Sequence, residues 1–258
     1  MEVHHHSHTP RKKWSHYFWE FLMLFLAVFC GFLAENQREH IVEKLRAKEY
    51  AKSLLSDMRL DTGELRRGIS ITKFTNSCMD SIISISKRMS NTQTVPRSFY
   101  YYSKFISQSF RVDWSRSTID QLIQSGNLRY FRNKELVALI NEYYSLQGLI
   151  AAQNQIESVH RDRTMDLRNS ILLNRYYSME DFNFSVYLTP SRQEDSLDIE
   201  MVPLQEDAAR QMDKYLNYLN DRKWRSAIMI NKYYINANKI AIKIIEALNS
   251  SYHFEKTR

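Results

Sequence analysis

The chain has 258 residues and a formal net charge of +7, with 43% hydrophobic and 25% charged residues, a composition typical of a folded protein. Five glycines and four prolines are too few for the many tight turns of a β-sandwich or β-barrel. A mean hydropathy of −0.50 excludes a polytopic membrane protein, and two distant cysteines exclude a disulfide scaffold and a multi-cysteine zinc module. The expected fold class is therefore all-α.

An apolar segment near the N-terminus is the clearest feature of the chain. The residues from Phe21 to Ala34 carry no charge, and Trp14 and Tyr17 before them suit the aromatic belt of a membrane interface. The segment lacks the small-x-small pattern of a signal-peptidase site. We therefore expect an uncleaved transmembrane anchor over residues 17–34, with a cleaved signal peptide or a buried core helix as the alternatives.

Local charge predicts the orientation of this anchor. Arg11, Lys12 and Lys13 precede it, whereas the residues directly after it carry a slight excess of acidic side chains. Because positive residues favour the cytoplasmic side, we expect residues 1–16, a histidine-rich basic tail, in the cytoplasm. Residues 35–258 are then an extracytoplasmic domain, so the expected location is a bacterial inner membrane with the bulk of the chain in the periplasm.

Apolar residues at helical spacing predict that the exterior domain starts with a long helix continuous with the anchor. This helix is expected to end before a polar loop at residues 90–96, after which a short helix follows. A second short helix over 119–125 is expected to start at a Ser117 or Thr118 cap and to end at Gly126.

Two long helices complete the predicted domain. The first is expected to start at an Asn133 cap, and its apolar stripe is Leu136, Leu139, Tyr143, Leu146, Ile150, Ile156 and Val159. Residues 178–205 lose this periodicity and are expected to form an irregular excursion. The final helix has apolar residues at spacings of three and four from Met212 to Leu248, with Lys223 as the one charged member of the stripe. The predicted architecture is an elongated up-and-down helical bundle that continues from the transmembrane helix.

Two segments of the chain resemble a known family. They are HYFWEFLMLFLAVFCGFLAENQREH, around Phe21, and STIDQLIQSGNLRYFRNKELVALINEYY, from Ser117 to Tyr144. Both are similar to an uncharacterised, domain-of-unknown-function family of single-span membrane proteins from Bacteroidota. The resemblance covers most of the chain, apart from the acidic excursion around Asp195. It implies a membrane address and a helical exterior domain, and it implies no activity.

Glu20 is the one candidate site residue, because a carboxylate within a membrane segment is energetically expensive and is often functional. Near the cytoplasmic end of the anchor, its side chain can reach the membrane interface. The alternatives are a polar contact with a partner helix and a step in a proton path.

The remaining clusters favour structural roles. His4, His5, His6 and His8 could hold a metal ion, but the tail offers no scaffold to fix their geometry. Paired tyrosines beside Lys and Arg are expected to place one ring of each pair in the core rather than to bind nucleic acid. Cys78 lies on an apolar stripe, as a structural cysteine does.

The sequence predicts no catalytic, cofactor-binding or metal-binding residue, and we do not expect an enzyme. We expect a non-enzymatic scaffold or interaction module; the alternative is a sensory or transducing subunit that couples a periplasmic signal to a partner membrane protein. The expected partners are the lipid bilayer and either a second copy of the chain or another membrane protein. Neither nucleic acid nor a small-molecule ligand is predicted.

Overall fold

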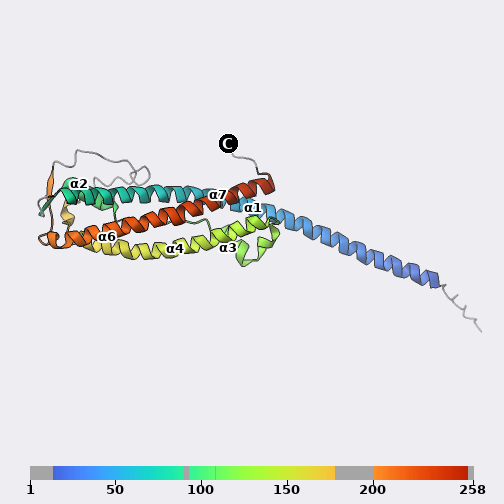
Figure 1. Cartoon of the computed structure of the whole chain (residues 1–258). Coiled ribbons are helices and arrows are strands. Elements are labelled where there is room, and N and C mark those ends of the chain that lie inside the picture. Colours follow the sequence, from blue (N-terminus) through green and yellow to red (C-terminus); the bar gives the residue numbers. More distant parts are fainter. Residues whose placement is uncertain (1–13, 90–92, 108, 178–199, 255–258) are drawn as a thin grey trace, which may run out of the picture. The chain divides into compact units, whose positions relative to one another are not determined.

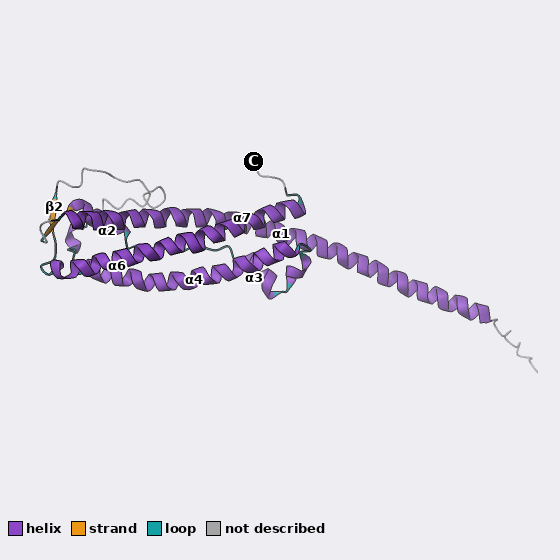
Figure 2. Cartoon of the chain, viewed as in Figure 1, coloured by secondary structure: helices purple, strands orange, loops and turns teal. Residues whose placement is uncertain are grey.

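The computed structural model describes residues 14–89, 93–107, 109–177 and 200–254. It divides into two compact units, Met1–Glu49 and Tyr50–Arg258. The described residues are mostly helical (Figure 2), which confirms the all-α fold class. The histidine tail and the greater part of the expected excursion, residues 178–199, lie outside the described residues.

The elements follow one another in a simple order. They are α1 (Trp14–Arg88), β1 (Thr94–Pro96), α2 (Arg97–Phe105), α3 (Ser117–Gln124), a 3-10 turn (Asn127–Tyr130), α4 (Lys134–Asn169), a 3-10 turn (Asn174–Tyr176), β2 (Met201–Pro203), α6 (Ala208–Ile228), a π-helix (Met229–Tyr234) and α7 (Ile235–Tyr252).

Four passes of the chain build the elongated unit Tyr50–Arg258 (Figure 1). The first pass is the later part of α1, the second is the segment 93–131 with α2 and α3, the third is α4, and the fourth is α6, the π-helix and α7. Successive passes reverse direction, so α1 and α4 run the same way. The expected up-and-down bundle is thus present, with a second pass that is only partly helical.

Two predicted helix boundaries are confirmed and one is wrong. The Asn133 side chain accepts two backbone N–H bonds, at 3.0 and 3.1 Å, and so caps α4. Gly126 has a φ of 67°, the left-handed conformation that follows a helix end. Neither Ser117 nor Thr118 caps α3, because the helix already includes Ser117 and Arg116 occupies the cap position.

A two-stranded ladder closes one end of the bundle, where the sequence predicted only loop. β1 and β2 pair antiparallel, with Val95 opposite Val202, and both valines are buried. The Tyr100 hydroxyl holds this end together, because it donates to the Pro203 carbonyl at 2.7 Å and accepts from the Leu173 N–H at 3.0 Å. Each strand has three residues and contains a proline, so the sequence pattern indicated a loop.

Two apolar clusters fill the bundle. The cluster next to the ladder includes Met79, Ile82, Phe99, Phe105, Tyr215 and Leu219. The cluster at the other end includes Leu54, Leu65, Ile140, Tyr143, Tyr234 and Ile244. Between them, the facing positions of α1, α4 and α6 carry polar side chains, and this is where the candidate site lies.

The fourth pass buries Arg222 where the sequence indicated Lys223 as the charged member of the stripe. Arg222 is 1% exposed, whereas Lys223 turns outward and pairs with Asp80. The π-helix that follows has a wider turn than an α-helix and so shifts the phase of the stripe. From Tyr234 to Leu248 the stripe faces the core again, as predicted.

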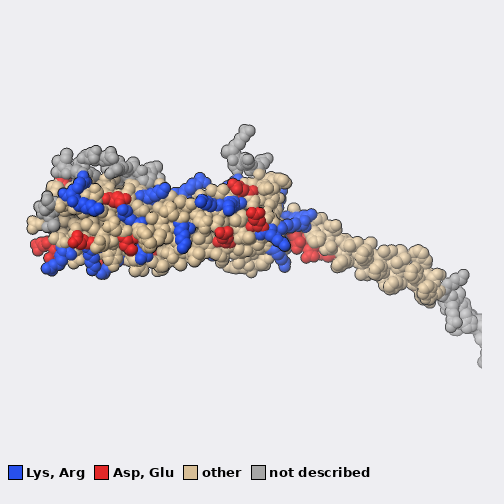
Figure 3. Space-filling view, in the orientation of Figure 1, with Lys and Arg blue, Asp and Glu red and all other residues tan. Residues whose placement is uncertain are grey.

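The N-terminal part of α1 is apolar and exposed. Large apolar side chains from Trp14 to Leu33, except Leu22, are 42% or more exposed. Within the described residues, α1 is the helix that is long and apolar enough to cross a membrane, by length and composition; its most apolar window has a mean hydropathy of 2.0. Figure 3 shows an almost uncharged surface over this stretch. The predicted anchor, residues 17–34, lies within it.

Candidate functional site

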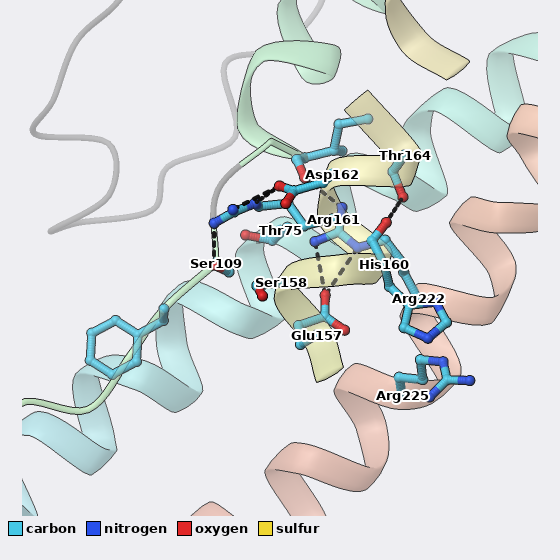
Figure 4. A network of polar contacts seen from close by, with 12 residues as sticks. Thr75, Ser109, Glu157, Ser158, His160, Arg161, Asp162, Thr164, Arg222 and Arg225 are labelled. Carbon is cyan, nitrogen blue, oxygen red and sulfur yellow. Dashed lines mark hydrogen bonds and ion pairs between the residues drawn. The ribbon is translucent and has the colours of Figure 1, made fainter. Parts of the chain in front are cut away.

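A buried ion pair crosses the bundle between the two apolar clusters (Figure 4). The Nε and Nη2 atoms of Arg222 contact Glu157 Oε1 at 3.0 Å, and Nη1 donates to the Ile106 carbonyl at 2.6 Å. Because a buried charge needs both a counter-charge and hydrogen bonds, these contacts fix the guanidinium. Arg222 thus links α6 to α4 and to the second pass.

Further charged side chains of α4 and α6 flank this pair. Asp221 accepts from Arg225 Nε at 2.8 Å and contacts His160 Nδ1 at 3.4 Å. Arg161 donates to the Ser109 hydroxyl at 3.2 Å. Figure 4 shows His160, Arg161 and Arg225 near Glu157 and Arg222. We call this group, together with the buried pair, the polar layer.

A cavity of about 100 Å³ opens beside the Arg222–Glu157 pair, and all four passes line it. Ile156 and Trp224 are lining residues that are 44% and 64% exposed, so they lie at its mouth. Deeper lining residues that bear on its chemistry are Thr75, Phe110, Gln153, Asn154, Arg225 and Tyr233. The cavity therefore combines charged, amide and aromatic walls.

Two departures from regular helix structure accompany this cavity. Residues 109–116 of the second pass have no regular secondary structure. Because an extended chain fills less space than a helix, this segment leaves room for the cavity. On the fourth pass, the π-helix contributes Met229, Tyr233 and Tyr234 to the lining. Single π-helical turns occur frequently at functional sites, which makes this part of the bundle the best candidate for a binding site.

Asp61 forms a second buried polar centre, on α1. Its carboxylate accepts from the Tyr143 hydroxyl and the Ser115 N–H, both at 2.8 Å, and lies 3.4 Å from Gln147 Nε2. Burial raises the pKa of the Asp61 carboxyl above its usual range; the bonds from Ser115 and Tyr143 lower it, and nearby Asp57 raises it. These contacts join the first three passes.

The solvent-facing side of α4 is largely apolar from Gly148 to Val159. From Gly148 to Val159, its exposed residues are Gly148, Leu149, Ala151, Ala152, Gln155, Ile156 and Val159, which we call the outer face of α4. Leu149, Ile156 and Val159 are 56%, 44% and 64% exposed. The prediction that Ile156 and Val159 belong to the core stripe is wrong, because the step from Ile150 to Ile156 turns them to the opposite side of the helix.

The site residues considered from the sequence lie apart from the polar layer. Glu20 is on α1, where its carboxylate is 3.1 Å from His16 Nε2, one turn earlier. Cys78 is buried in an apolar cluster, and burial raises the pKa of its thiol to about 12, so it is a poor nucleophile. The clustered histidines 4–8 lie outside the described residues.

Comparison with known proteins gives no relative for this chain: no protein-family model, no curated protein and no solved structure matches it. A proposal about function therefore depends on the contacts and surfaces of the described residues.

The sequence analysis did not identify Arg222, Glu157 or Asp61 as site residues. The sequence does contain weak signals for a buried polar residue in the final helix and for the outer face of α4. The apolar spacing of the final helix is interrupted between Leu219 and Ala227, and an interruption in a core stripe is where a buried polar residue belongs. The six-residue step between Ile150 and Ile156 indicated a second apolar face on the preceding helix. Asp61 carried no such signal, since its partners come from segments distant in sequence.

Proposed function

We propose that the protein is a single-pass membrane protein whose helical bundle is a non-enzymatic interaction module, and that two copies associate through the outer face of α4. One observation carries the proposal: this face exposes Leu149, Ile156 and Val159 on a stretch whose exposed residues are all uncharged. Leu149, Ala152, Ile156 and Val159 follow the three–four spacing of a helix–helix seam. Exposed apolar surface of this kind marks protein–protein contact sites.

The charges at the two ends of the face favour a second copy as the partner. Glu142 lies seven residues before Leu149, and Arg163 lies seven residues after Ile156, so all four share one side of α4. In an antiparallel pair centred near Ala152, Leu149 meets Ile156 of the other copy and Glu142 meets Arg163. Two chains anchored in one membrane can form this pair only if both bundles lie along the membrane surface. A parallel pair brings like charges together at both ends, which is unfavourable.

The proposal also includes the location of the protein in the membrane. The apolar start of α1 supports a single span, and the basic residues Arg11, Lys12 and Lys13 before it favour a cytoplasmic N-terminus. The location that follows is a bacterial inner membrane with the bundle in the periplasm. The resemblance of the anchor segment to single-span proteins of Bacteroidota supports this location.

The experiment compares the mass of the full chain in detergent, corrected for bound detergent, between variants. We expect a dimer for the native chain and a monomer for the double substitution Leu149→Glu and Ile156→Glu, because four buried carboxylates cannot pair. Leu60→Glu is the matched control, since Leu60 is 60% exposed on α1 and outside the face. A monomeric native chain, or a double variant that stays dimeric, would contradict the proposal.

A further inference from the structure

The wall of the cavity at Arg222 offers more hydrogen-bond donors than the protein uses. A guanidinium has five N–H groups, and three are occupied by Glu157 and the Ile106 carbonyl. Within the part of the chain that the structure describes, the other two have no partner. Because a buried donor without a partner is unfavourable, this wall favours a guest that is rich in acceptors.

The charged side chains of the lining offer further hydrogen-bond donors. Glu157, Arg222 and Arg225 are its charged residues, and the charge of Glu157 is balanced by Arg222. Arg225 uses Nε for Asp221, which leaves both of its terminal nitrogens without a partner among the described residues. Because Asp221 balances Arg225 as Glu157 balances Arg222, the two arginines supply free N–H donors to the cavity rather than an excess of charge.

Two amide side chains extend this donor set. Gln153 and Asn154 line the cavity from α4, one turn before Glu157, and both are half-buried. Neither makes a side-chain hydrogen bond within the described residues. An amide can donate to an anion or accept from a neutral group, so these residues adapt to the ligand, while the free N–H groups of the two arginines favour a carboxylate as the acceptor.

The other walls set the size and shape of the guest. Phe110, Trp224, Tyr233 and Met229 give the cavity flat apolar surfaces. An enclosed cavity of about 150 Å³ holds one benzene ring. This cavity, about 100 Å³ and open at Ile156 and Trp224, fits a single ring that reaches partly into the mouth.

We infer that this cavity binds a small organic carboxylate with one ring, the carboxylate towards Arg222 and Arg225 and the ring between Phe110, Trp224 and Tyr233. This goes beyond self-association, because it gives the bundle a ligand. All four passes contact the cavity, so an occupied cavity stabilises their packing against one another.

The test uses calorimetric titration of the detergent-solubilised full chain with four probes. Benzoate carries the ring and the charge, benzamide is its neutral counterpart, benzylamine is a cation of similar size, and acetate lacks the ring. We expect benzoate to bind at least tenfold more tightly than each of the other three. Equal or tighter binding of benzylamine or benzamide would overturn the charge assignment, and absence of benzoate binding would overturn the site.

Two substitutions connect binding to the cavity. Arg225→Gln is expected to weaken benzoate binding about tenfold to a hundredfold, as loss of a charged hydrogen bond does. Arg210→Gln removes an exposed arginine of α6 that lies outside both the lining and the outer face of α4, and it is expected to leave benzoate binding unchanged. Thermal unfolding of both variants checks that the bundle is intact. Equal losses in the two variants, or none in Arg225→Gln, would show that benzoate binds elsewhere.

Discussion

Arg222 places a charged group in the packed interior of the bundle, where it is 1% exposed. Its guanidinium is almost fully buried and pairs with the carboxylate of Glu157, which is 22% exposed. Removing one member of a buried pair leaves an uncompensated charge in the interior, whereas an apolar replacement of both members is often tolerated. The pair Lys223–Asp80 on the surface, with Asp80 60% exposed, offers a direct comparison.

We expect Glu157→Gln to lower the free energy of unfolding by about 3–5 kcal/mol, because it strands the Arg222 charge. Asp80→Asn breaks the surface pair and is expected to cost less than about 1 kcal/mol. Urea unfolding followed by circular dichroism measures both. The double substitution Glu157→Met and Arg222→Met is expected to recover most of the loss; if it is worse than Glu157→Gln alone, the buried charge is not the cause.

Asp61 is expected to make stability depend on pH. Its pKa is raised above the ordinary value of 3.8 because the carboxyl is buried. Above pH 3.8, and until the raised pKa is passed, the folded protein holds more protons at Asp61 than the unfolded chain does. Its contribution to the unfolding free energy is therefore largest at low pH, falls as pH rises through this window, and is constant above it.

The measurement is a set of urea unfolding midpoints across this pH range, for the native chain and for Asp61→Asn. The variant has no charge to bury, so it is expected to lack the decline that the native chain shows on raising the pH. Parallel curves for the two proteins would mean that Asp61 titrates as an exposed carboxyl does.

At the scale of elements, two glycines of α1 have opposite roles. A Cβ on Gly68 would lie 2.5 Å from the Cδ1 and Cε1 atoms of Phe110, so this glycine lets the second pass lie against the helix. A Cβ on Gly63 would meet nothing within 4 Å. Gly68 therefore serves the packing, whereas Gly63 only weakens the helix.

We expect Gly63→Ala to raise the free energy of unfolding by about 1 kcal/mol, the difference in helix propensity. Gly68→Ala is expected to lower it by about 1–3 kcal/mol, because the ring of Phe110 has to move out of a packed position. The same urea titration gives both values. A stabilising Gly68→Ala would show that Phe110 is not held against α1.

The elements that the sequence predicts well are those with strong local signals. The Asn133 cap and the left-handed Gly126 are local chemistry, and both are confirmed. The tyrosine pairs also follow expectation at two places, since Tyr143 and Tyr234 are buried while their neighbours Tyr144 and Tyr233 are only partly so. Each of these features depends on a few adjacent residues.

The β1–β2 ladder, the π-helix and the polar layer depend on contacts between distant segments. β1 and β2 are separated by about a hundred residues, and each is too short to show an alternating pattern. Arg222 needs a carboxylate from α4 and a carbonyl from the second pass, and no spacing within one helix indicates such partners. The sequence alone therefore does not predict these features, and the structure is needed to identify them.

The whole molecule combines an apolar segment long enough to cross a membrane with a bundle that has an exposed apolar face and a cavity. Ile156 belongs to both the outer face of α4 and the mouth of the cavity. A second copy that covers this face therefore also lies beside the opening. Association and ligand binding are expected to influence each other, and by linkage the influence is mutual.

Disulfide crosslinking in native membranes tests the antiparallel contact of two copies most directly. In a Cys30→Ser background, which removes the exposed cysteine and keeps the buried Cys78, chains with Leu149→Cys and chains with Ile156→Cys are produced together. Our account predicts a mixed disulfide dimer between the two kinds of chain. Dimers of Leu149→Cys with itself in place of the mixed species, or crosslinking no stronger than that of Leu60→Cys, would contradict it.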